Sequence, residues 1–254
     1  MKNQYFGDIN DYMKYSLLRL LGGNGQLGIA ICWALTEDDG GFDGRRTGYL
    51  TQPDRWEMHD AVIFCLLREE VLRRGNRSVS VIEQADVLQN CSYFDEIIRD
   101  EEHLRDVYFE EFFRFAEDAD FVFFDPDNGL DVKSVPRGGR GSSKYVYQDE
   151  VETAYASGHT ILLYQHFPRQ PRDSFINNMI RRFRDLEGIR RVISYSTSHV
   201  VFLLLPQPRH EELLLSNTKD VERNWGSHIR VKNHRIPGRS GAGKGTSGNA
   251  DSVS

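Results

Sequence analysis

The chain of 254 residues has few cysteines, the residues that form disulfides in small secreted proteins and bind metal ions through sulfur. It contains three cysteines, Cys32, Cys65 and Cys91, which is an odd number, and they lie far apart in the sequence. This set fits neither a disulfide framework nor a CxxC metal site. Free cysteines are typical of a reducing compartment, so we expect a cytoplasmic protein.

Long apolar runs and a large charge excess are also missing. No run approaches the length of a membrane-spanning helix, and the N-terminus has no apolar signal core, so we expect no membrane association. The net charge is −6, from 32 Lys and Arg against 38 Asp and Glu. This balance argues against a general nucleic-acid coating protein, although a local basic patch can still contact a nucleotide or a nucleic acid. Nothing in the sequence indicates the oligomeric state.

What the sequence does have is an alternation of helical and strand patterns. We expect helices over 9–21, 56–74, 104–116, 148–156 and 174–186, and strands over 28–35, 78–83, 120–125, 160–165, 191–195 and 200–205. The link between the last two strands is too short for a crossover helix, so these strands must be antiparallel neighbours. The pattern predicts an α/β fold, a doubly wound Rossmann-like mixed sheet with helices on both faces and a C-terminal antiparallel hairpin.

The same pattern indicates a single domain over residues 1–231. From about Lys232 to Ser254 the composition changes to Gly, Ser, Lys, Arg and Asn, which predicts a disordered tail. Residues 238–244 have the GxxxxGK spacing of a phosphate-binding loop. Gly245 stands where that loop requires Ser or Thr, and neither a strand nor a helix flanks it, so we interpret the match as coincidence.

The most informative segment is 119–130, where an apolar strand ends in a polar turn. Phe121 to Phe124 has no polar alternation, which is typical of a parallel strand covered on both faces. Ligands bind at the carboxyl ends of such strands. Pro126 ends the hydrogen-bond ladder there, and the next strand ends in a histidine. The candidate catalytic residues are therefore Asp125, Pro126, Asp127, Asn128 and His166.

Two segments resemble a known family. Residues 7–18, GDINDYMKYSLL, are similar to the opening GNxxDxxKHxxLL of the ribosomal RNA adenine-N6 methyltransferases of the large-subunit J type, with Tyr15 in place of the histidine. The three-Cys-motif partner proteins begin with a similar helix. Asp125-Pro126 stands where these methyltransferases have DPPY or DPPF, with Asp127-Asn128 replacing the last two residues. The resemblance implies a Rossmann-like methyltransferase that uses S-adenosylmethionine (SAM).

The resemblance also implies roles for residues at the strand ends. The amino-acid end of SAM carries both charges, so acids after the first strand and a cation from the first helix would bind it. An acid after the second strand would accept hydrogen bonds from the ribose, and Asp125 would accept one from the amino group that is methylated. The candidate cofactor-binding residues are Asp11, Lys14, Glu37, Asp38 and Glu83.

A glycine-rich basic loop over residues 137–144 follows the candidate catalytic turn. Such a loop is suited to clamping substrate phosphates, and a further arginine follows the strand that ends in His166. The substrate would then be a nucleic acid or a nucleotide. The candidate substrate-binding residues are Arg137, Arg140, Lys144 and Arg169.

Two other functions remain open. Asp125, Asp127 and Asp131 are oxygen ligands of the kind that Mg²⁺ prefers, so a metal-dependent hydrolase or nuclease is one alternative. The other is a Rossmann-like binding module without catalysis. It is motivated by Glu37-Asp38-Asp39-Gly40-Gly41, which stands after the first strand where a GxG turn is usual, and by the altered DPPY.

Overall fold

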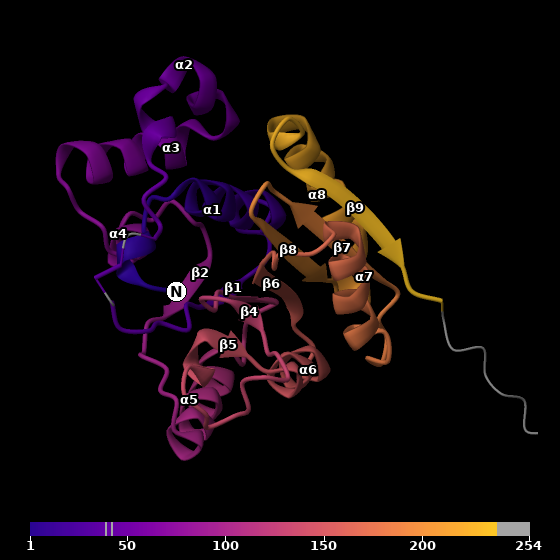
Figure 1. The fold of residues 1–254 in the computed structure, drawn as a ribbon. Coiled ribbons are helices and arrows are strands. Elements are labelled where there is room, and N and C mark those ends of the chain that lie inside the picture. Colours follow the sequence, from indigo (N-terminus) through magenta and orange to yellow (C-terminus); the bar gives the residue numbers. More distant parts are fainter. Residues whose placement is uncertain (39, 42, 238–254) are drawn as a thin grey trace, which may run out of the picture.

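The structure is a computed structural model that describes residues 1–38, 40–41 and 43–237, and its centre is one mixed sheet (Figure 1). Seven strands form this sheet in the order β2-β1-β3-β6-β8-β7-β9, and β4 and β5 form a small parallel sheet of their own. The strands are β1 (Ile29–Cys32), β2 (Cys91–Phe94), β3 (Phe121–Phe124), β4 (Gly129–Leu130), β5 (Tyr145–Val146), β6 (Thr160–His166), β7 (Arg191–Ser196), β8 (Val200–Leu205) and β9 (Arg230–Arg235).

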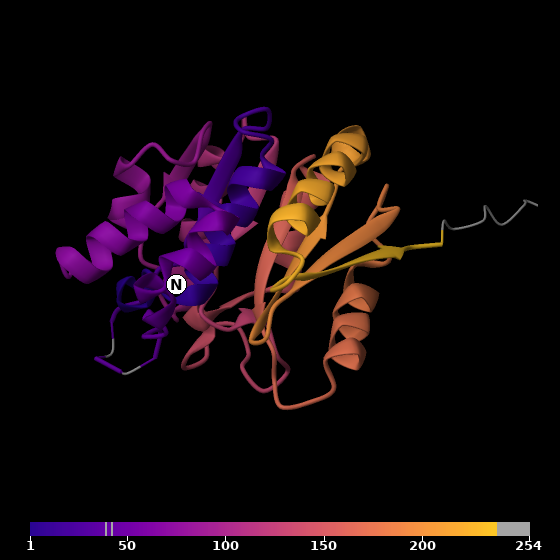
Figure 2. The same cartoon turned by 90° about the horizontal axis from the view of Figure 1, so that it is seen from above.

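Helices cover both faces of the sheet, and Figure 2 shows α8 on one side and α7 on the other. The α-helices are α1 (Ile9–Leu21), α2 (Pro53–Trp56), α3 (Ala61–Leu67), α4 (Ser80–Gln84), α5 (Glu102–Phe115), α6 (Gln148–Ala156), α7 (Arg172–Phe183) and α8 (Glu211–Trp225). Short 3-10 turns lie at Asn3–Tyr5, Gly48–Thr51, Glu57–His59, Ser142–Lys144 and Pro208–His210, and a π-helical turn lies at Arg68–Arg73. Within the described residues, no helix is long and apolar enough to cross a lipid bilayer.

Alternate residues of the central strands point into two separate cores. Phe121 and Phe123 of β3 pack in the core beneath α1, α3 and α8. Val122 and Phe124 pack in the opposite core, with α5, α6 and α7. Because both faces are covered, these strands need no polar alternation, which explains their continuous apolar sequence.

The strand directions confirm the expected fold class. β2, β1, β3 and β6 run parallel, whereas β8 lies antiparallel to both of its neighbours, β6 and β7. The hairpin of β7 and β8 pairs Ile193 with Leu204. The protein therefore has an α/β fold with a C-terminal antiparallel hairpin. The carboxyl ends of its four parallel strands share one edge of the sheet, the edge where such sheets bind ligands.

The second strand in chain order differs from the sequence expectation. Residues 80–83 of the expected strand over 78–83 lie in α4, and the strand beside β1 is β2. Ser78 Oγ accepts a hydrogen bond from the Ser80 amide at 3.3 Å, and this local bond favours a helical turn over the extended form that Val81 and Ile82 prefer. Glu83 therefore lies on a helix and not at a strand end. β2 is an edge strand with Phe94 as its buried residue, so its apolar pattern is weak.

The helix expected over 56–74 is divided at Asp60. The Asp60 carboxylate caps α3 by accepting a hydrogen bond from the Ile63 amide at 3.2 Å. The backbone of Asp60 also binds the hydroxyl group of Tyr12 on α1. A tertiary contact thus breaks a helix that apolar periodicity alone would continue.

Two C-terminal elements go beyond the sequence expectation. α8 joins α1 through a hydrogen bond from Asn217 Nδ2 to the Leu21 carbonyl at 3.1 Å. β9 pairs antiparallel with the full length of β7, so residues 232–235 belong to the sheet and not to a tail. Their polar sequence suits an edge strand, where one partner satisfies the backbone. Residues 238–254, with the GxxxxGK spacing, lie outside the described residues.

Removal of β9 tests its contribution to stability. We predict that a chain ending after Ile229 has a Tm roughly 5 °C below that of a chain ending after Pro237, because β7 loses its outer partner. Scanning calorimetry of the two truncated chains measures the difference. Equal Tm values would show that β9 adds nothing to the stability of the sheet.

Candidate functional site

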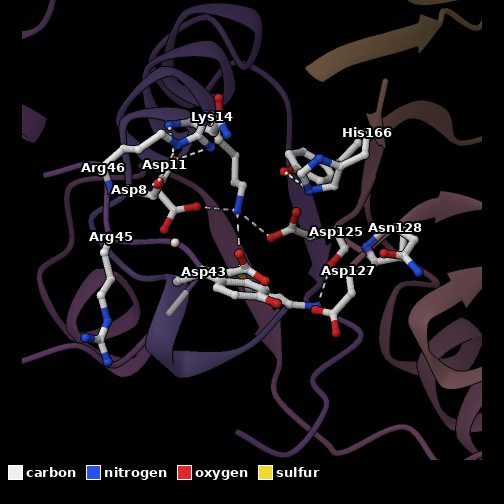
Figure 3. Close-up of a pocket in the computed structure, with 16 residues that line it drawn as sticks. Asp8, Asp11, Lys14, Asp43, Arg45, Arg46, Asp125, Asp127, Asn128 and His166 are labelled. Carbon is white, nitrogen blue, oxygen red and sulfur yellow. Dashed lines mark hydrogen bonds and ion pairs between the residues drawn. The ribbon is translucent and has the colours of Figure 1, made fainter. Parts of the chain in front are cut away.

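A cavity of about 580 Å³ lies at the carboxyl edge of the sheet, between α1 and the ends of β3 and β6 (Figure 3). We call it the Asp125 cavity. Its lining residues are Met1, Tyr5, Asp8, Asn10, Asp11, Lys14, Asp43, Gly44, Arg45, Arg46, Asp125, Pro126, Asp127, Asn128, Tyr164 and His166. All five candidate catalytic residues and two candidate cofactor-binding residues, Asp11 and Lys14, are among them.

Lys14 lies between two buried carboxylates in this cavity. Its Nζ is 2.7 Å from Asp11 Oδ1 and 2.6 Å from Asp125 Oδ2, as the dashed lines in Figure 3 show. Lys14 and Asp125 are each 1% exposed, and Asp11 is 3% exposed. This buried ion group ties the first helix to the end of the central strand.

The start of α1 is built to present these side chains. Asp8 is the N-cap, and its carboxylate accepts a hydrogen bond from the Asn10 amide at 3.1 Å. Gly7 before it has a φ of +81°, and a Cβ there would come within 2.4 Å of Val71 Cγ2. The Gly7 amide donates to Asp11 Oδ2 at 3.1 Å, so the entry turn also fixes the acid that binds Lys14.

Burial and neighbouring charges shift the pKa values of this group. Burial raises the pKa of Asp11 to about 6, Lys14 opposes this shift, and the nearby charge of Asp125 adds to it. Burial alone would lower the pKa of Lys14, but the charges of Asp11 and Asp125 outweigh it and raise that pKa. Lys14 therefore stays protonated at neutral pH. Protonation of Asp11 removes one negative charge from this group.

The turn after β3 is fixed by a buried carboxamide. Gln165 Oε1 accepts a hydrogen bond from the Leu130 amide at 2.8 Å, and Gln165 Nε2 donates to the Asn128 carbonyl at 3.0 Å. Gly129 has a φ of +114°, and a Cβ there would come within 2.3 Å of the Gln165 side chain. Glycine at position 129 is thus required for the turn that follows Asp125 and Asp127.

Asp127 joins the ends of β1 and β3. Its carboxylate accepts a hydrogen bond from Thr36 Oγ1 at 2.8 Å and lies 2.9 Å from the ammonium nitrogen of Met1. The same nitrogen is 3.0 Å from the carbonyl oxygens of Ala34 and Asp125. Three oxygen acceptors therefore converge at this point of the sheet edge.

The rim of the Asp125 cavity contains charged residues that the sequence did not single out. Arg46 binds the Asp8 carboxylate through Nη2 at 3.0 Å and Nε at 3.1 Å, and Arg45 and Asp43 lie beside it in Figure 3. These residues come from a loop whose place over α1 depends on tertiary contacts. The adjacent Arg45-Arg46 pair was the available signal in the sequence.

His166 reaches the same rim from the end of β6. Its Nε2 is 2.9 Å from the hydroxyl group of Tyr164, which lines the cavity. Loss of hydration and the charge of Arg46 lower the pKa of His166 below its usual range. His166 is therefore neutral at physiological pH. Its imidazole nitrogens can exchange a proton with Tyr164 or with a ligand.

A second cavity of about 440 Å³ lies at the ends of β1 and β2, and we call it the Asp95 cavity. Glu37, Asp38 and Glu83 line this cavity and not the Asp125 cavity. Glu83 accepts a hydrogen bond from Trp33 Nε1 at 2.7 Å. Asp95 follows β2 directly, so it has the strand-end position that the sequence assigned to Glu83. The sequence did not assign this position to Asp95 because β2 is a short edge strand with a weak apolar pattern.

The four candidate substrate-binding residues do not line either cavity. Arg137 forms ion pairs with Asp149 and Glu150, and Arg140, Lys144 and Arg169 are exposed. The Asp100 carboxylate accepts hydrogen bonds from the amides of Gly141 and Ser143 at 2.7 and 2.8 Å. The glycine-rich basic loop over residues 137–144 is thus fastened to the body of the protein.

The carboxylates of the metal hypothesis each have a cationic partner. Asp125 binds Lys14, Asp127 lies against the Met1 ammonium, and Asp131 Oδ1 is 2.6 Å from Arg182 Nη2. Among the described residues, no three His, Cys, Asp or Glu side chains are grouped to hold a metal ion. Binding of Mg²⁺ at Asp125 and Asp127 remains a hypothesis that would require these ion pairs to open.

Comparisons with known proteins give a distant structural likeness. No family model matches the chain, and no curated protein matches it by sequence. One similar solved structure is that of a Legionella pneumophila protein described under the family model DUF519. It has 10% sequence identity and a TM-score of 0.44, and the alignment covers 91% of this chain and 98% of that chain.

Replacement of Lys14 tests the buried ion group. We predict that Lys14→Met lowers the free energy of unfolding at pH 8 by about 3–5 kcal/mol, because Asp11 and Asp125 remain buried without a cation. The loss should shrink as the pH falls toward 5. A carboxyl group whose pKa is raised in the folded state takes up a proton there first, so folding gains stability as the pH falls.

Urea unfolding at pH 8 and pH 5 measures both effects. Lys219→Met, at an exposed position on α8, is the matched control and should change stability little. A loss for Lys14→Met that is the same at both pH values would contradict the charge argument.

Proposed function

We propose that the protein transfers a methyl group from SAM to a nucleotide-like substrate, either a nucleotide or a nucleic acid. One observation carries the proposal. Lys14 Nζ and Asp125 Oδ2 are 2.6 Å apart, although they belong to the two separate segments that resemble the methyltransferases. Two sequence matches that are independent of each other thus meet in one cavity, at the edge where parallel sheets bind ligands.

The acceptors at the sheet edge fit the amino-acid end of SAM. An ammonium group needs several oxygen acceptors, and the Ala34 carbonyl, the Asp125 carbonyl and the Asp127 carboxylate lie within 3.0 Å of one ammonium, that of Met1. The ammonium of a bound ligand would take the place of the Met1 ammonium there. These acceptors belong to the ends of β1 and β3.

The Asp95 cavity fits the nucleoside end. Asp95 follows β2, where an acid can accept hydrogen bonds from ribose hydroxyl groups, and Leu35 and Ile97 supply apolar walls for a base. Thr36 lines this cavity and binds Asp127, which lines the other one, so the two cavities adjoin. When bound, SAM supplies a methyl group that is already electrophilic on its sulfonium.

Asp125 and Lys14 contribute by positioning. Lys14 holds the Asp125 carboxylate toward the cavity, and Asp125 accepts a hydrogen bond from the substrate amino group, which aligns the nitrogen lone pair. With SAM bound, Asp125 would hold the amino nitrogen toward the methyl group that SAM supplies, and the nitrogen would release a proton to water. No strong base is needed for this step.

The rim of the Asp125 cavity has two arginines that would bind an anionic substrate, and one of them, Arg46, is also paired with Asp8. Arg45 and Arg46 lie there, and arginine is well suited to phosphate oxygens. Tyr164 offers an aromatic wall, and its ring centre is 5.4 Å from Lys14 Nζ. A volume of about 580 Å³ is in the usual range for a ligand of nucleotide size.

Replacement of Asp95 tests cofactor binding. We predict that Asp95→Asn weakens SAM binding about tenfold, because the amide accepts hydrogen bonds from ribose hydroxyl groups less strongly than a carboxylate. Isothermal titration calorimetry with SAM measures the affinity. Glu96→Gln, at the next position and outside both cavities, is the matched control and should bind SAM normally. Absence of SAM binding by the unchanged protein would sink the proposal.

Replacement of Asp125 separates catalysis from binding. We predict that Asp125→Asn retains SAM affinity within a few-fold but lowers the rate of methyl transfer by about 10²-fold, because the amino group loses its charged acceptor. Transfer of a labelled methyl group to mixed nucleotides and RNA measures the rate. SAM binding without any transfer by the unchanged protein would favour the non-catalytic module, and Mg²⁺-dependent phosphodiester cleavage would favour the hydrolase.

A further inference from the structure

Asn10 on α1 is a buried polar residue whose side chain has no hydrogen-bond partner among the described residues. Its side chain lines the Asp125 cavity and is 4% exposed. Its carboxamide oxygen is shut off from solvent and accepts no hydrogen bond, and no bond of the carboxamide nitrogen occurs within the described residues. The neighbouring acids differ, since Asp8 binds Arg46 and Asp11 binds Lys14.

Burial of an unpaired carboxamide opposes folding, and buried polar groups are almost always paired. Gln165 shows the ordinary arrangement in the same protein, because its carboxamide bonds to the backbone at Asn128, Leu130 and His166. An apolar side chain at position 10 would avoid the cost. The position of Asn10 on a cavity wall points to a partner that arrives with the ligand.

The other residues with a buried unpaired side-chain atom support this reading. Among the described residues with such an atom, Asn10 and Asp127 line the Asp125 cavity, and Asp127 Oδ1 faces the Met1 ammonium. Ser16, two turns further along α1, is also buried and unpaired but lies outside the cavity. Within the part of the chain that the structure describes, the side chain of Asn10 thus lines the cavity with its hydrogen-bonding groups unused.

A carboxamide offers one donor and one acceptor side by side, and a turn of 180° about its last bond exchanges them. It matches a planar group that presents the complementary pair. The edge of a base with an amino group next to a ring nitrogen is such a group, and asparagine forms paired hydrogen bonds with it. Asn128 adds a second carboxamide to the same cavity from the turn after β3.

We propose that Asn10 is a specificity-determining residue that binds the amino-bearing edge of the substrate base through two hydrogen bonds. This inference rests on the proposed function for the nucleotide-like substrate, but not on methyl transfer itself. It offers a physical reason why Asp127-Asn128 stands in place of the last two residues of DPPY. Asp127-Asn128 removes the aromatic residue that would stack on a base, and hydrogen bonds from carboxamides provide the selection in its place.

Calorimetric titration of the full chain with nucleotide probes tests the inference. We expect AMP or CMP to bind the unchanged protein about tenfold more tightly than purine riboside 5′-monophosphate, which lacks the amino group. Asn10→Leu should abolish this preference while it leaves Tm equal or higher, because it removes an unpaired polar group from the interior. Ser16→Ala removes the same kind of group from the same helix and should keep the preference.

Asn10→Asp serves if the leucine variant does not fold, because it keeps the shape and loses the donor, and it should also lose the preference. Failure of AMP and CMP to bind the unchanged protein, or an unchanged preference in the folded Asn10 variants, would overturn the inference. A separate titration with SAM keeps the two proposals apart. If Asn10 discriminates between the nucleotides but the protein does not bind SAM, this inference stands and the proposal of methyl transfer fails.

Discussion

The ion group of Asp11, Lys14 and Asp125 is the constraint on which the carboxyl edge of the sheet depends. It links residues that are 111 positions apart, and all three side chains are removed from water. Charges in such surroundings are tolerated only when each has an opposite charge in good geometry. The ion group therefore holds α1 against the end of β3, where both border the Asp125 cavity.

The sequence predicted the parts of the fold whose physical signal is local and strong. Phe121–Phe124 and Val200–Leu205 are buried on both faces. Such strands appear in a sequence as continuous apolar runs, wherever they lie in the chain. β2 could not be found in this way because, as an edge strand, it buries Phe94 alone. Because β2 was not predicted, the acid at the end of the second strand was assigned to Glu83 instead of Asp95. A single misplaced strand thus changed the identity of a candidate ligand.

The candidate site was predictable to the extent that strand ends determine it. Asp125 and Asp127 follow β3 and His166 ends β6, and the structure brings them to one cavity with Lys14. Arg46 and Asn10 were not assigned to the site from the sequence, for different reasons. The rim position of Arg46 arises from its contact with Asp8, and the unpaired state of Asn10 is a property of its surroundings that no sequence pattern records.

The two outer strands also bear on how copies of the protein meet. β2 at one border has four residues, and β9 at the other contains three cationic residues, Arg230, Lys232 and Arg235. An open border invites a strand from another molecule, and a short strand or a row of cations discourages this pairing. Two β9 strands would repel each other through their cations, and two β2 strands would offer few backbone groups for pairing. The exposed backbone of this sheet is therefore a poor template for fibrous self-association.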